Sequence, residues 1–369
     1  MKVIVFTQAY NAEQTLSRAI SSILDQTFQN IEYYILDNGS TDRTWDIILD
    51  YAKRDPRVIP LSIKKNDIEN GWSFFCALEW ASNAEYSVWL DADDAYDRHF
   101  LEEMTRFAQE NALDIAMCGY DMIDGVTGRT IKCRALEKNL VLSGKDFADK
   151  FIEYRGFTNA GWGRLYALSF FKTFSRKNQN VSKSDYSPYG DSAYQLCLLE
   201  NAERAGVYRK AMYRYYQYPH SLIRQDLKEN LKGYAGYIVA ARQYLEHYGP
   251  ISKGNEDFLY AIYLSFADES AEHAFSSDLS VSEKLELLRL TFSEPLWAET
   301  LAREADPQFR NLAARREYVT RMKERILALA STPEEQELAE KAVRELDKPI
   351  ASGPTQRCGE GTVWAHRVQ

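Results

Sequence analysis

Residues 1–120 alternate between short runs of apolar, often β-branched residues and longer stretches in which apolar positions recur at helical spacing. Such alternation is typical of strand–helix units, which build a parallel sheet with helices on its faces. The predicted strands are Lys2–Thr7, Ile31–Asp37, Val58–Ile63, Tyr86–Leu90 and Asp114–Gly119. The predicted helices are Ala12–Gln26, Asp42–Arg54, Trp72–Ser82 and Arg98–Glu110.

The alternation ends after Gly119, where shorter and more turn-rich elements begin. The segment Val126–Arg129 predicts the turn of a hairpin, and helical spacing predicts helices at Lys145–Arg155 and Asp191–Asn201. From about Asp226 the pattern becomes almost purely helical and rich in Tyr and Leu. Two of these later predicted helices are Val281–Leu290 and Arg316–Leu329.

These changes of pattern divide the chain into three parts. We predict a doubly wound α/β domain over residues 1–225, with halves at 1–120 and 121–225, followed by a helical region over residues 226–349. Residues 350–369 show no periodicity and contain several turn-forming residues, which indicates a flexible tail.

Composition narrows the class of protein. The chain has 369 residues and 45% hydrophobic residues, which is ordinary for a soluble globular protein with a sizeable core. Its formal net charge of −9 argues against nucleic acid as a partner, because phosphate backbones require a basic face. Neither a membrane span nor a secretory signal is expected from the sequence, so we predict a cytoplasmic protein. The five cysteines are scattered without zinc-ligand spacing, and buried thiols are expected.

Three predicted strands end in polar residues. They are followed by Tyr10-Asn11, by Asp37-Asn38-Gly39-Ser40 and by Asp91-Ala92-Asp93-Asp94. In parallel sheets the carboxyl ends of the strands meet at one edge, where ligands bind. Crowded carboxylates raise one another's pKa unless a cation or a shared proton neutralises them, which indicates chemistry on phosphates. The alternative is a solvated acidic turn that caps the next helix.

Taken together, the segments Val3–Glu13, Ile35–Thr44 and Trp89–Asp94 resemble the family 2 glycosyltransferases of the GT-A fold in sequence, order and spacing. The resemblance covers residues 1–220 and implies a nucleotide-diphospho-sugar transferase fold with a mostly parallel sheet. It assigns the nucleotide to residues 1–120 and the acceptor to residues 121–225. It also implies a nucleoside-diphosphate sugar as donor, most simply a UDP-sugar.

The resemblance places donor contacts in the first two loops. Tyr10 would stack on the nucleobase, Glu13 would reach base or ribose, and Asp37 would hold the base. For Glu13 the alternative is a carboxylate that favours the helix dipole. For Asp37 the alternative is that the side chain only shapes its own turn.

The acidic segment, by the same resemblance, holds the donor ribose and a Mg²⁺ or Mn²⁺ ion that bridges the diphosphate. Oxygen ligands suit both ions. Asp93 and Asp94 are the expected metal ligands, and Asp91 is a further donor contact.

A glycosyl transfer that inverts the anomeric carbon also needs a base for the acceptor hydroxyl. The segment Ser187–Tyr194 resembles the family's position for that base, which makes Asp191 the candidate. The alternative is that Asp191 only caps the following helix. In the segment Asn159–Tyr166, Trp162 would stack on the acceptor sugar, or else pack in the core, and Arg164 would contact the diphosphate.

Some positions depart from the family pattern. Gln8 replaces a proline, and Cys76 stands where an arginine is common, so a cationic diphosphate contact is missing. Lys64 or Lys65 would supply that charge, unless both are solvated loop residues. Tyr218 occupies the position of a common histidine, while His220 lies two residues later.

The leading prediction is therefore a metal-dependent, inverting glycosyltransferase that acts on a saccharide or lipid-linked acceptor in cell-envelope polysaccharide synthesis. The alternatives are a phosphoryl-transfer enzyme that uses the Asp-x-Asp strand end and a nucleotide-sugar-binding module without activity. The helical region would pair two copies, hold the acceptor or rest on the inner face of the membrane. Acidic patches such as Glu334–Glu337 do not favour anionic lipid, so a packing role leads.

Overall fold

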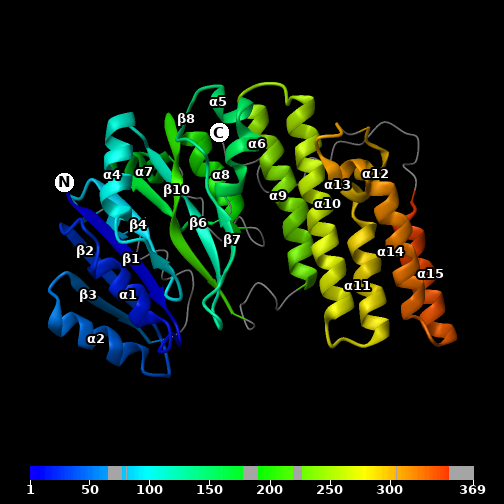
Figure 1. Ribbon diagram of the computed structural model, residues 1–369, viewed down its shortest axis with the longest axis horizontal. Coiled ribbons are helices and arrows are strands. Elements are labelled where there is room, and N and C mark those ends of the chain that lie inside the picture. The colour runs from blue at the N-terminus through cyan, green and yellow to red at the C-terminus, as the bar shows by residue number, and fades with distance from the viewer. Residues whose placement is uncertain are drawn as a thin grey trace. The chain divides into compact units, whose positions relative to one another are not determined.

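The computed structural model describes residues 1–64, 77–79, 81–158, 160–177, 190–218, 227–304 and 306–348. The chain forms two compact units, Met1–Asn255 and Glu256–Gln369. The first unit is built on one mixed sheet, and the described part of the second unit is helical (Figure 1).

Ten strands form the sheet of the first unit, in the order β3-β2-β1-β4-β9-β6-β10-β5, with β7 beside β6 and β8 beside β10. The strands are β1 (Val3–Ala9), β2 (Ile31–Asn38), β3 (Val58–Ile63), β4 (Tyr86–Trp89), β5 (Ala95–Tyr96), β6 (Ile115–Asp124), β7 (Thr130–Arg134), β8 (Leu140–Ser143), β9 (Arg164–Ala167) and β10 (Arg204–Gln217).

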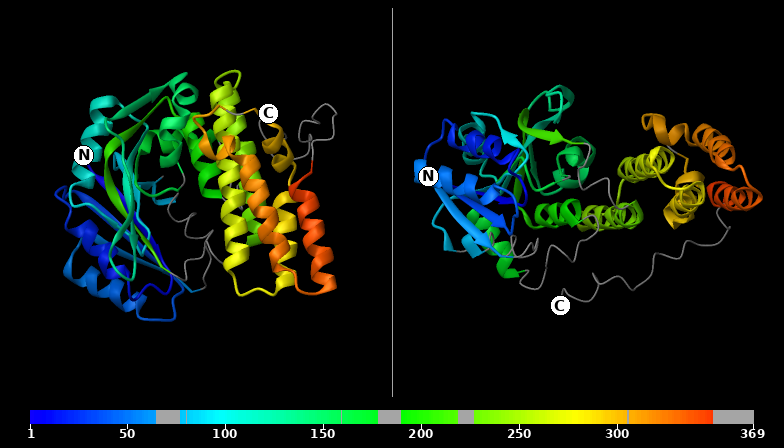
Figure 2. Two further views of the ribbon diagram at one scale, coloured as in Figure 1. Left: turned by 45° about the vertical axis from the view of Figure 1, so that its right-hand side comes forward. Right: turned by 90° about the horizontal axis from the view of Figure 1, so that it is seen from below.

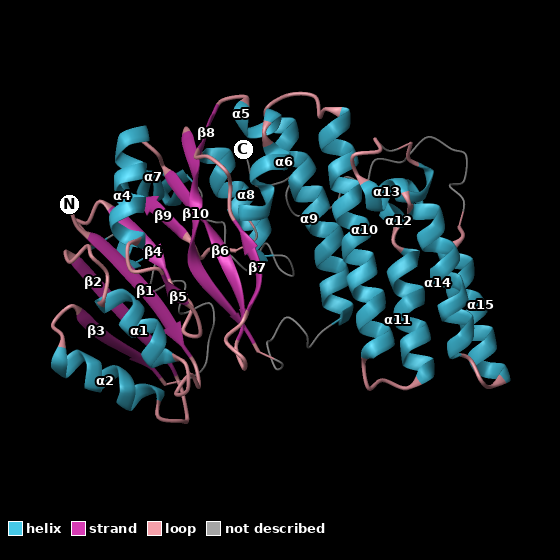
Figure 3. Ribbon diagram, viewed as in Figure 1, coloured by secondary structure: helices cyan, strands magenta, loops and turns pink. Residues whose placement is uncertain are grey.

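Strand direction decides where the functional loops meet. β1, β2, β3 and β4 are parallel, and β9 runs antiparallel to both β4 and β6. Since β6 is parallel to β10, these two strands run in the same direction as β1 (Figure 3). The carboxyl ends of β1, β2, β4, β6 and β10 therefore lie at one edge of the sheet.

Helices pack on the sheet through buried apolar side chains, as α1 shows. Its apolar face consists of Leu16, Ala19, Ile20 and Ile23, all fully buried in one core with residues of β1 and β2. The helical segments of this unit are α1 (Leu16–Leu24), α2 (Thr44–Arg54), α4 (Phe100–Asn111), α5 (Asp146–Asp149), α6 (Phe151–Tyr154), the 3₁₀ turn η1 (Arg155–Phe157), α7 (Leu168–Lys177), α8 (Gly190–Asn201) and α9 (Leu227–His247).

The second unit packs its helices around buried aliphatic and aromatic residues. Trp297 is fully buried, and its indole Nε1 donates to the Leu346 carbonyl at 3.1 Å. The long helices are seen nearly end-on in the right-hand view of Figure 2. The helices are α10 (Lys253–Ser276), α11 (Val281–Ser293), α12 (Pro295–Ala302), α13 (Arg310–Ala313), α14 (Arg315–Leu329) and α15 (Pro333–Leu346).

The predicted α/β class and the hairpin at residues 126–129 are confirmed, but two helices differ. The helix expected at Lys145–Arg155 is α5, α6 and η1 instead, because the Phe147 carbonyl accepts the Tyr154 hydroxyl at 2.6 Å and the chain leaves helical geometry at Lys150. The first helix begins at Leu16 rather than Ala12, since the preceding residues bond to the loop after β2. Most of the helix predicted at Trp72–Ser82 lies outside the described residues.

The boundary between the two compact units falls after Asn255. The predicted boundary at residue 225, where the helical pattern begins, stays a prediction. Tyr244 of α9 shares a 2.6 Å hydrogen bond with Tyr154, and Arg155 donates from Nε to the Tyr237 hydroxyl at 2.8 Å. These bonds attach α9 to α6 and η1 of the first unit.

Exposure differs among the described cysteines. Cys118 is buried, which raises the pKa of its thiol to about 12. The expectation of buried thiols is wrong for Cys133, which lies exposed on strand β7. Cys76 and Cys358 lie outside the described residues. None of the helices within the described ranges combines the length and apolar character that crossing a membrane requires.

Candidate active site

The loops after β1 and β2 are bound to each other through side chains. The Asn11 backbone N–H donates to Ser40 Oγ at 2.9 Å, and the Thr41 backbone N–H donates to the side-chain oxygen Asn11 Oδ1 at 2.9 Å. Glu13 Oε2 accepts the Arg43 N–H at 3.1 Å. Asn11 has a φ of 48°, a left-handed conformation that asparagine tolerates. The two loops therefore form one platform at the sheet edge.

Two predicted donor residues, Tyr10 and Asp37, lie on this platform. The Tyr10 side chain is 47% exposed, which leaves its ring accessible to a nucleobase. Asp37 is 4% exposed, and its Oδ1 accepts the Ser40 N–H at 3.2 Å. Asp37 thus shapes its own turn, and Glu13 ties the two loops together. Their donor contacts remain predictions.

The three carboxylates of the acidic segment, Asp91, Asp93 and Asp94, differ in burial. Asp91 and Asp93 are partly exposed, and Asp91 Oδ1 accepts the Trp89 indole N–H at 3.0 Å. Asp94 is fully buried. Its Oδ2 accepts the Tyr213 hydroxyl at 2.6 Å, and its Oδ1 accepts the Tyr216 N–H at 2.8 Å.

These surroundings decide what each aspartate can do. Burial raises the pKa of Asp94 well above its ordinary value, and the charges of Asp91 and Asp93 raise it further. The prediction that Asp94 is a metal ligand is not supported, because both of its oxygens are bonded to β10 and none of its surface is accessible. Burial also raises the pKa of Asp93, whose side chain keeps some exposure.

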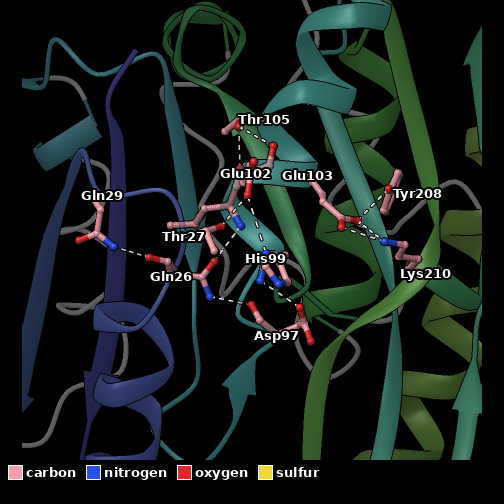
Figure 4. Close-up of polar contacts among 11 residues, drawn as sticks. Gln26, Thr27, Gln29, Asp97, His99, Glu102, Glu103, Thr105, Tyr208 and Lys210 are labelled. Carbon is pink, nitrogen blue, oxygen red and sulfur yellow. Dashed lines mark hydrogen bonds and ion pairs between the residues drawn. The ribbon is translucent and has the colours of Figure 1, made fainter.

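The segment between β4 and α4 is held at its far end by the loop that follows α1. Gln26 is 1% exposed; its Nε2 donates to the Asp97 carbonyl at 2.7 Å, and its Oε1 accepts the Leu101 N–H at 2.9 Å. Thr27 Oγ1 donates to Glu102 Oε2 at 2.7 Å, as Figure 4 shows. The segment between β4 and α4 is therefore fixed at both ends.

Arg18 of α1 is a site residue that sequence reasoning missed. Its Nη2 donates to the Asp93 carbonyl and, at 3.0 Å, to the Tyr218 hydroxyl. Its guanidinium lies 3.6 Å from the centre of the Tyr216 ring. The sequence carries no signal for this, because Arg18 lies on the polar face of an amphipathic helix. A cation therefore lies beside the acidic segment, and Tyr218 bonds to it.

Trp162 packs against β10, the strand that bonds to Asp94. Its ring stacks on Tyr213 at 4.4 Å with an interplanar angle of 4°, and on Tyr215 at 5.4 Å. The Tyr96 hydroxyl accepts the Gly163 N–H at 3.1 Å and donates to the Trp89 carbonyl at 2.7 Å. Trp162 therefore has the predicted packing role, and its partial exposure leaves room for the predicted sugar contact.

Arg164 does not occupy the predicted position on the donor. It is fully buried, and its guanidinium donates to Gln195 Oε1 and, at 2.9 Å, to the Phe157 carbonyl. Burial lowers the pKa of the guanidinium. Because a fully buried side chain offers no surface to a ligand, Arg164 is better described as an anchor for α8.

Asp191, the predicted base, lies exposed in the first turn of α8. The Arg164 charge interacts with Asp191, and Gln195 follows one turn later in the same helix. The Tyr166 hydroxyl also donates to Gln195 Oε1 at 2.9 Å. Gln195 thus fixes the helix that carries Asp191, while His220, Lys65 and Asn159 lie outside the described residues.

No cluster of three or more Asp, Glu, His or Cys side chains within the described ranges is arranged to hold a metal ion. Asp91 and Asp93 nevertheless supply two partly exposed carboxylates at the end of one strand. Mg²⁺ is commonly held by one or two carboxylates together with substrate phosphates and water. The donor set of these two residues therefore fits an ion that arrives with a diphosphate.

The Tyr213→Phe variant is expected to lower the free energy of unfolding by about 1–3 kcal/mol, because a buried carboxylate oxygen of Asp94 would lose its donor. Urea unfolding of both proteins measures the change. Tyr120→Phe is the matched control, since its ring also contacts Trp162, at 5.0 Å, and no hydrogen bond of its hydroxyl is found among the described residues. Equal losses in both variants would contradict the role given to the Tyr213 hydroxyl.

Comparison with known proteins gives likenesses to a protein family and to individual proteins. The model of glycosyl transferase family 2 matches residues 4–177. The chain is 27% identical over 258 residues to the uncharacterized glycosyltransferase EpsJ of Bacillus subtilis (strain 168), across 69% of this chain and 73% of EpsJ. It is 32% identical over 121 residues to the putative teichuronic acid biosynthesis glycosyltransferase TuaG of that strain, across 33% of this chain and 47% of TuaG.

Among solved structures, the chain resembles S. aureus TarS 1-349 in complex with UDP, with a TM-score of 0.55 and 16% sequence identity over 85% of this chain and 87% of that one. The sheet and this likeness show the GT-A fold. The match assigns residues 4–177 to glycosyltransferase family 2, and the likeness to EpsJ supports a glycosyltransferase.

Proposed function

We propose that the chain is an inverting, metal-dependent glycosyltransferase. It transfers a sugar from a nucleoside-diphosphate donor, most simply a UDP-sugar, to a hydroxyl of a saccharide or lipid-linked acceptor. The observation that carries the proposal is the single edge of the sheet that combines the loop platform with the acidic segment. The name of TuaG supports work in envelope polysaccharide synthesis. The UDP complex of TarS supports a nucleotide donor.

The proposed mechanism uses two groups of residues on different elements. Tyr10 and Asp37 hold the nucleotide on the platform, and Trp162 presents a partly exposed ring to the acceptor sugar. Asp191 takes the proton of the acceptor hydroxyl as that oxygen bonds to the anomeric carbon. The bond from this carbon to the diphosphate oxygen breaks, and the nucleoside diphosphate leaves from the opposite face.

Asp91 and Asp93 would hold Mg²⁺ or Mn²⁺. When bound, such an ion neutralises charge on the departing diphosphate. Arg18 keeps the backbone of Asp93 in place through its bond to the Asp93 carbonyl. This arrangement separates the residues that hold the leaving group from the residue that accepts the proton.

Of the two alternative functions, only the inactive binding module remains. Phosphoryl transfer is not retained, because residues 4–177 match glycosyltransferase family 2 and the acidic segment follows β4 rather than the first strand. A nucleotide-sugar-binding module without activity remains the competing proposal, since Tyr218 differs from the family pattern.

The first test is thermal unfolding with UDP, GDP, CDP and dTDP, each with and without Mn²⁺. We expect UDP with Mn²⁺ to raise the Tm, because a ligand at a hundredfold excess over its Kd adds about 2.7 kcal/mol of stability. Equal stabilisation with and without the ion would contradict metal dependence. Release of UDP from a UDP-sugar only when a saccharide acceptor is present would exclude the inactive module.

A further inference from the structure

The two most exposed large hydrophobic side chains of the described residues lie in one hairpin. Val126 is 73% exposed and Ile131 is 56% exposed. Val126 lies in the turn between β6 and β7, and Ile131 lies on β7. A single exposed apolar residue needs no explanation, but two in one hairpin indicate a contact surface.

The fold keeps both side chains in solvent. Met122 pairs with Lys132 and Ile123 pairs with Thr130, so Ile131 is the extra residue of a β-bulge. At the turn, Asp124 Oδ1 accepts the Val126 N–H at 2.9 Å. Further bonds from Thr127 and Gly128 to Asp124, and a φ of +71° at Gly128, close the turn. The hairpin is therefore a preformed element that presents Val126 and Ile131 outward.

The hairpin adjoins the active-site edge of the sheet. It follows the carboxyl end of β6, the same edge as the ends of β1 and β4, and Figure 3 shows β6 and β7 side by side. At its base the Gly125 N–H donates to the Gln217 carbonyl at 2.8 Å, and the Tyr218 ring packs on Gly125. Tyr218 in turn bonds to Arg18 beside the acidic segment.

The small apolar area of the hairpin and its charged residues indicate which kind of partner it contacts. Two side chains are far too few for a stable protein interface, which buries about 1,200–2,000 Å². A lipid surface needs only a small apolar tip accompanied by cations. Arg129 and Lys132 are exposed on the same hairpin, whereas the net charge of −9 gives the chain no overall attraction to anionic lipid.

We propose that the β6–β7 hairpin is a membrane-contact element that inserts Val126 and Ile131 into the interfacial region of an anionic lipid surface, with Arg129 and Lys132 at the headgroups. This inference rests on the proposed function, because contact at this edge brings the active site to a lipid-linked acceptor. The binding is weak and reversible, because so few apolar groups take part.

The test is flotation of the full chain with phosphatidylcholine vesicles, prepared with and without phosphatidylglycerol. We expect flotation only with the anionic vesicles, and less of it at high salt. The variant Val126→Ser/Ile131→Thr should reduce the bound fraction about tenfold, because most of the inserted apolar surface is lost. Arg129→Gln and Lys132→Gln should each reduce it about fivefold.

Leu327→Thr is the matched control, since Leu327 is 45% exposed on α14, and it should float like the wild type. UDP binding should be unchanged in every hairpin variant, which separates this proposal from failure of the proposed function. Lack of flotation of the wild type, or equal flotation of all variants, would overturn the proposal. So would hairpin variants that float normally but transfer poorly to a soluble saccharide, because the hairpin would then contact the acceptor itself.

Discussion

Replacement of Asp191 by Asn is expected to lower kcat by about 10²–10⁴-fold, the range that general bases contribute, while UDP binding is retained. Asparagine cannot take the proton of the acceptor hydroxyl, but it nearly matches aspartate in size. The side chain is exposed, and the Gln195 bonds to Arg164 and Tyr166 hold α8 in both proteins. The Tm should therefore change little. Initial rates with saturating donor, together with UDP titration, measure the two effects separately.

Asp149→Asn provides the control for Asp191→Asn. Asp149 is also an exposed aspartate in a first helical turn, that of α5, so its loss removes the same charge without removing the proposed base. Its kcat should remain near that of the wild type. Near-native turnover of Asp191→Asn would show that the base is another residue. A parallel loss of UDP affinity would show that Asp191 acts on the donor.

Replacement of Asp93 by Asn is expected to weaken Mn²⁺-dependent UDP binding by at least about 100-fold. Loss of a residue that only supports a metal ligand costs about 10–100-fold, and Asp93 is proposed to be a ligand itself. Titration calorimetry of UDP with and without Mn²⁺ measures this difference. The small affinity that remains without the ion should be the same in both proteins, since the loop platform is unaltered.

The Asp94→Asn variant distinguishes the role of Asp94 from that of Asp93. Both oxygens of Asp94 accept hydrogen bonds, and an amide would turn one of these acceptors into a donor that faces another donor. We expect this variant to lose about 1–3 kcal/mol of unfolding free energy and to bind Mn²⁺ and UDP normally once folded. If Asp94→Asn lost metal-dependent binding while Asp93→Asn kept it, the assignment of the two residues would be reversed.

Much of the fold could be predicted because strand and helix periodicity are local properties. The five predicted strands recur as β1, β2, β3, β4 and β6, although β6 continues to Asp124. The strands β5, β8, β9 and β10 were not predicted, since each depends on pairing with a strand distant in sequence. The start of α1 was misplaced because bonds to the loop after β2, 30 or so residues away, decide where the helix begins.

Part of the candidate site could be predicted because sequence motifs, like periodicity, are local. The motifs indicated which strand ends carry chemistry, but they could not show burial. Asp94 and Arg164 look like binding groups in the sequence, yet both are fully buried and bonded to other elements. Arg18 was missed because its partners, Asp93, Tyr216 and Tyr218, are 75 to 200 residues away in the chain.

By itself, the sequence determined the α/β class, the resemblance to family 2 glycosyltransferases and the acidic segment that follows the fourth strand, because these depend on residue type and spacing along the chain. Only the tertiary structure decided that Asp91 and Asp93 keep accessible surface, whereas Asp94 is buried and hydrogen-bonded to β10. The physical reason is that accessibility and hydrogen-bond partners are set by residues distant in sequence, which come together only when the sheet forms.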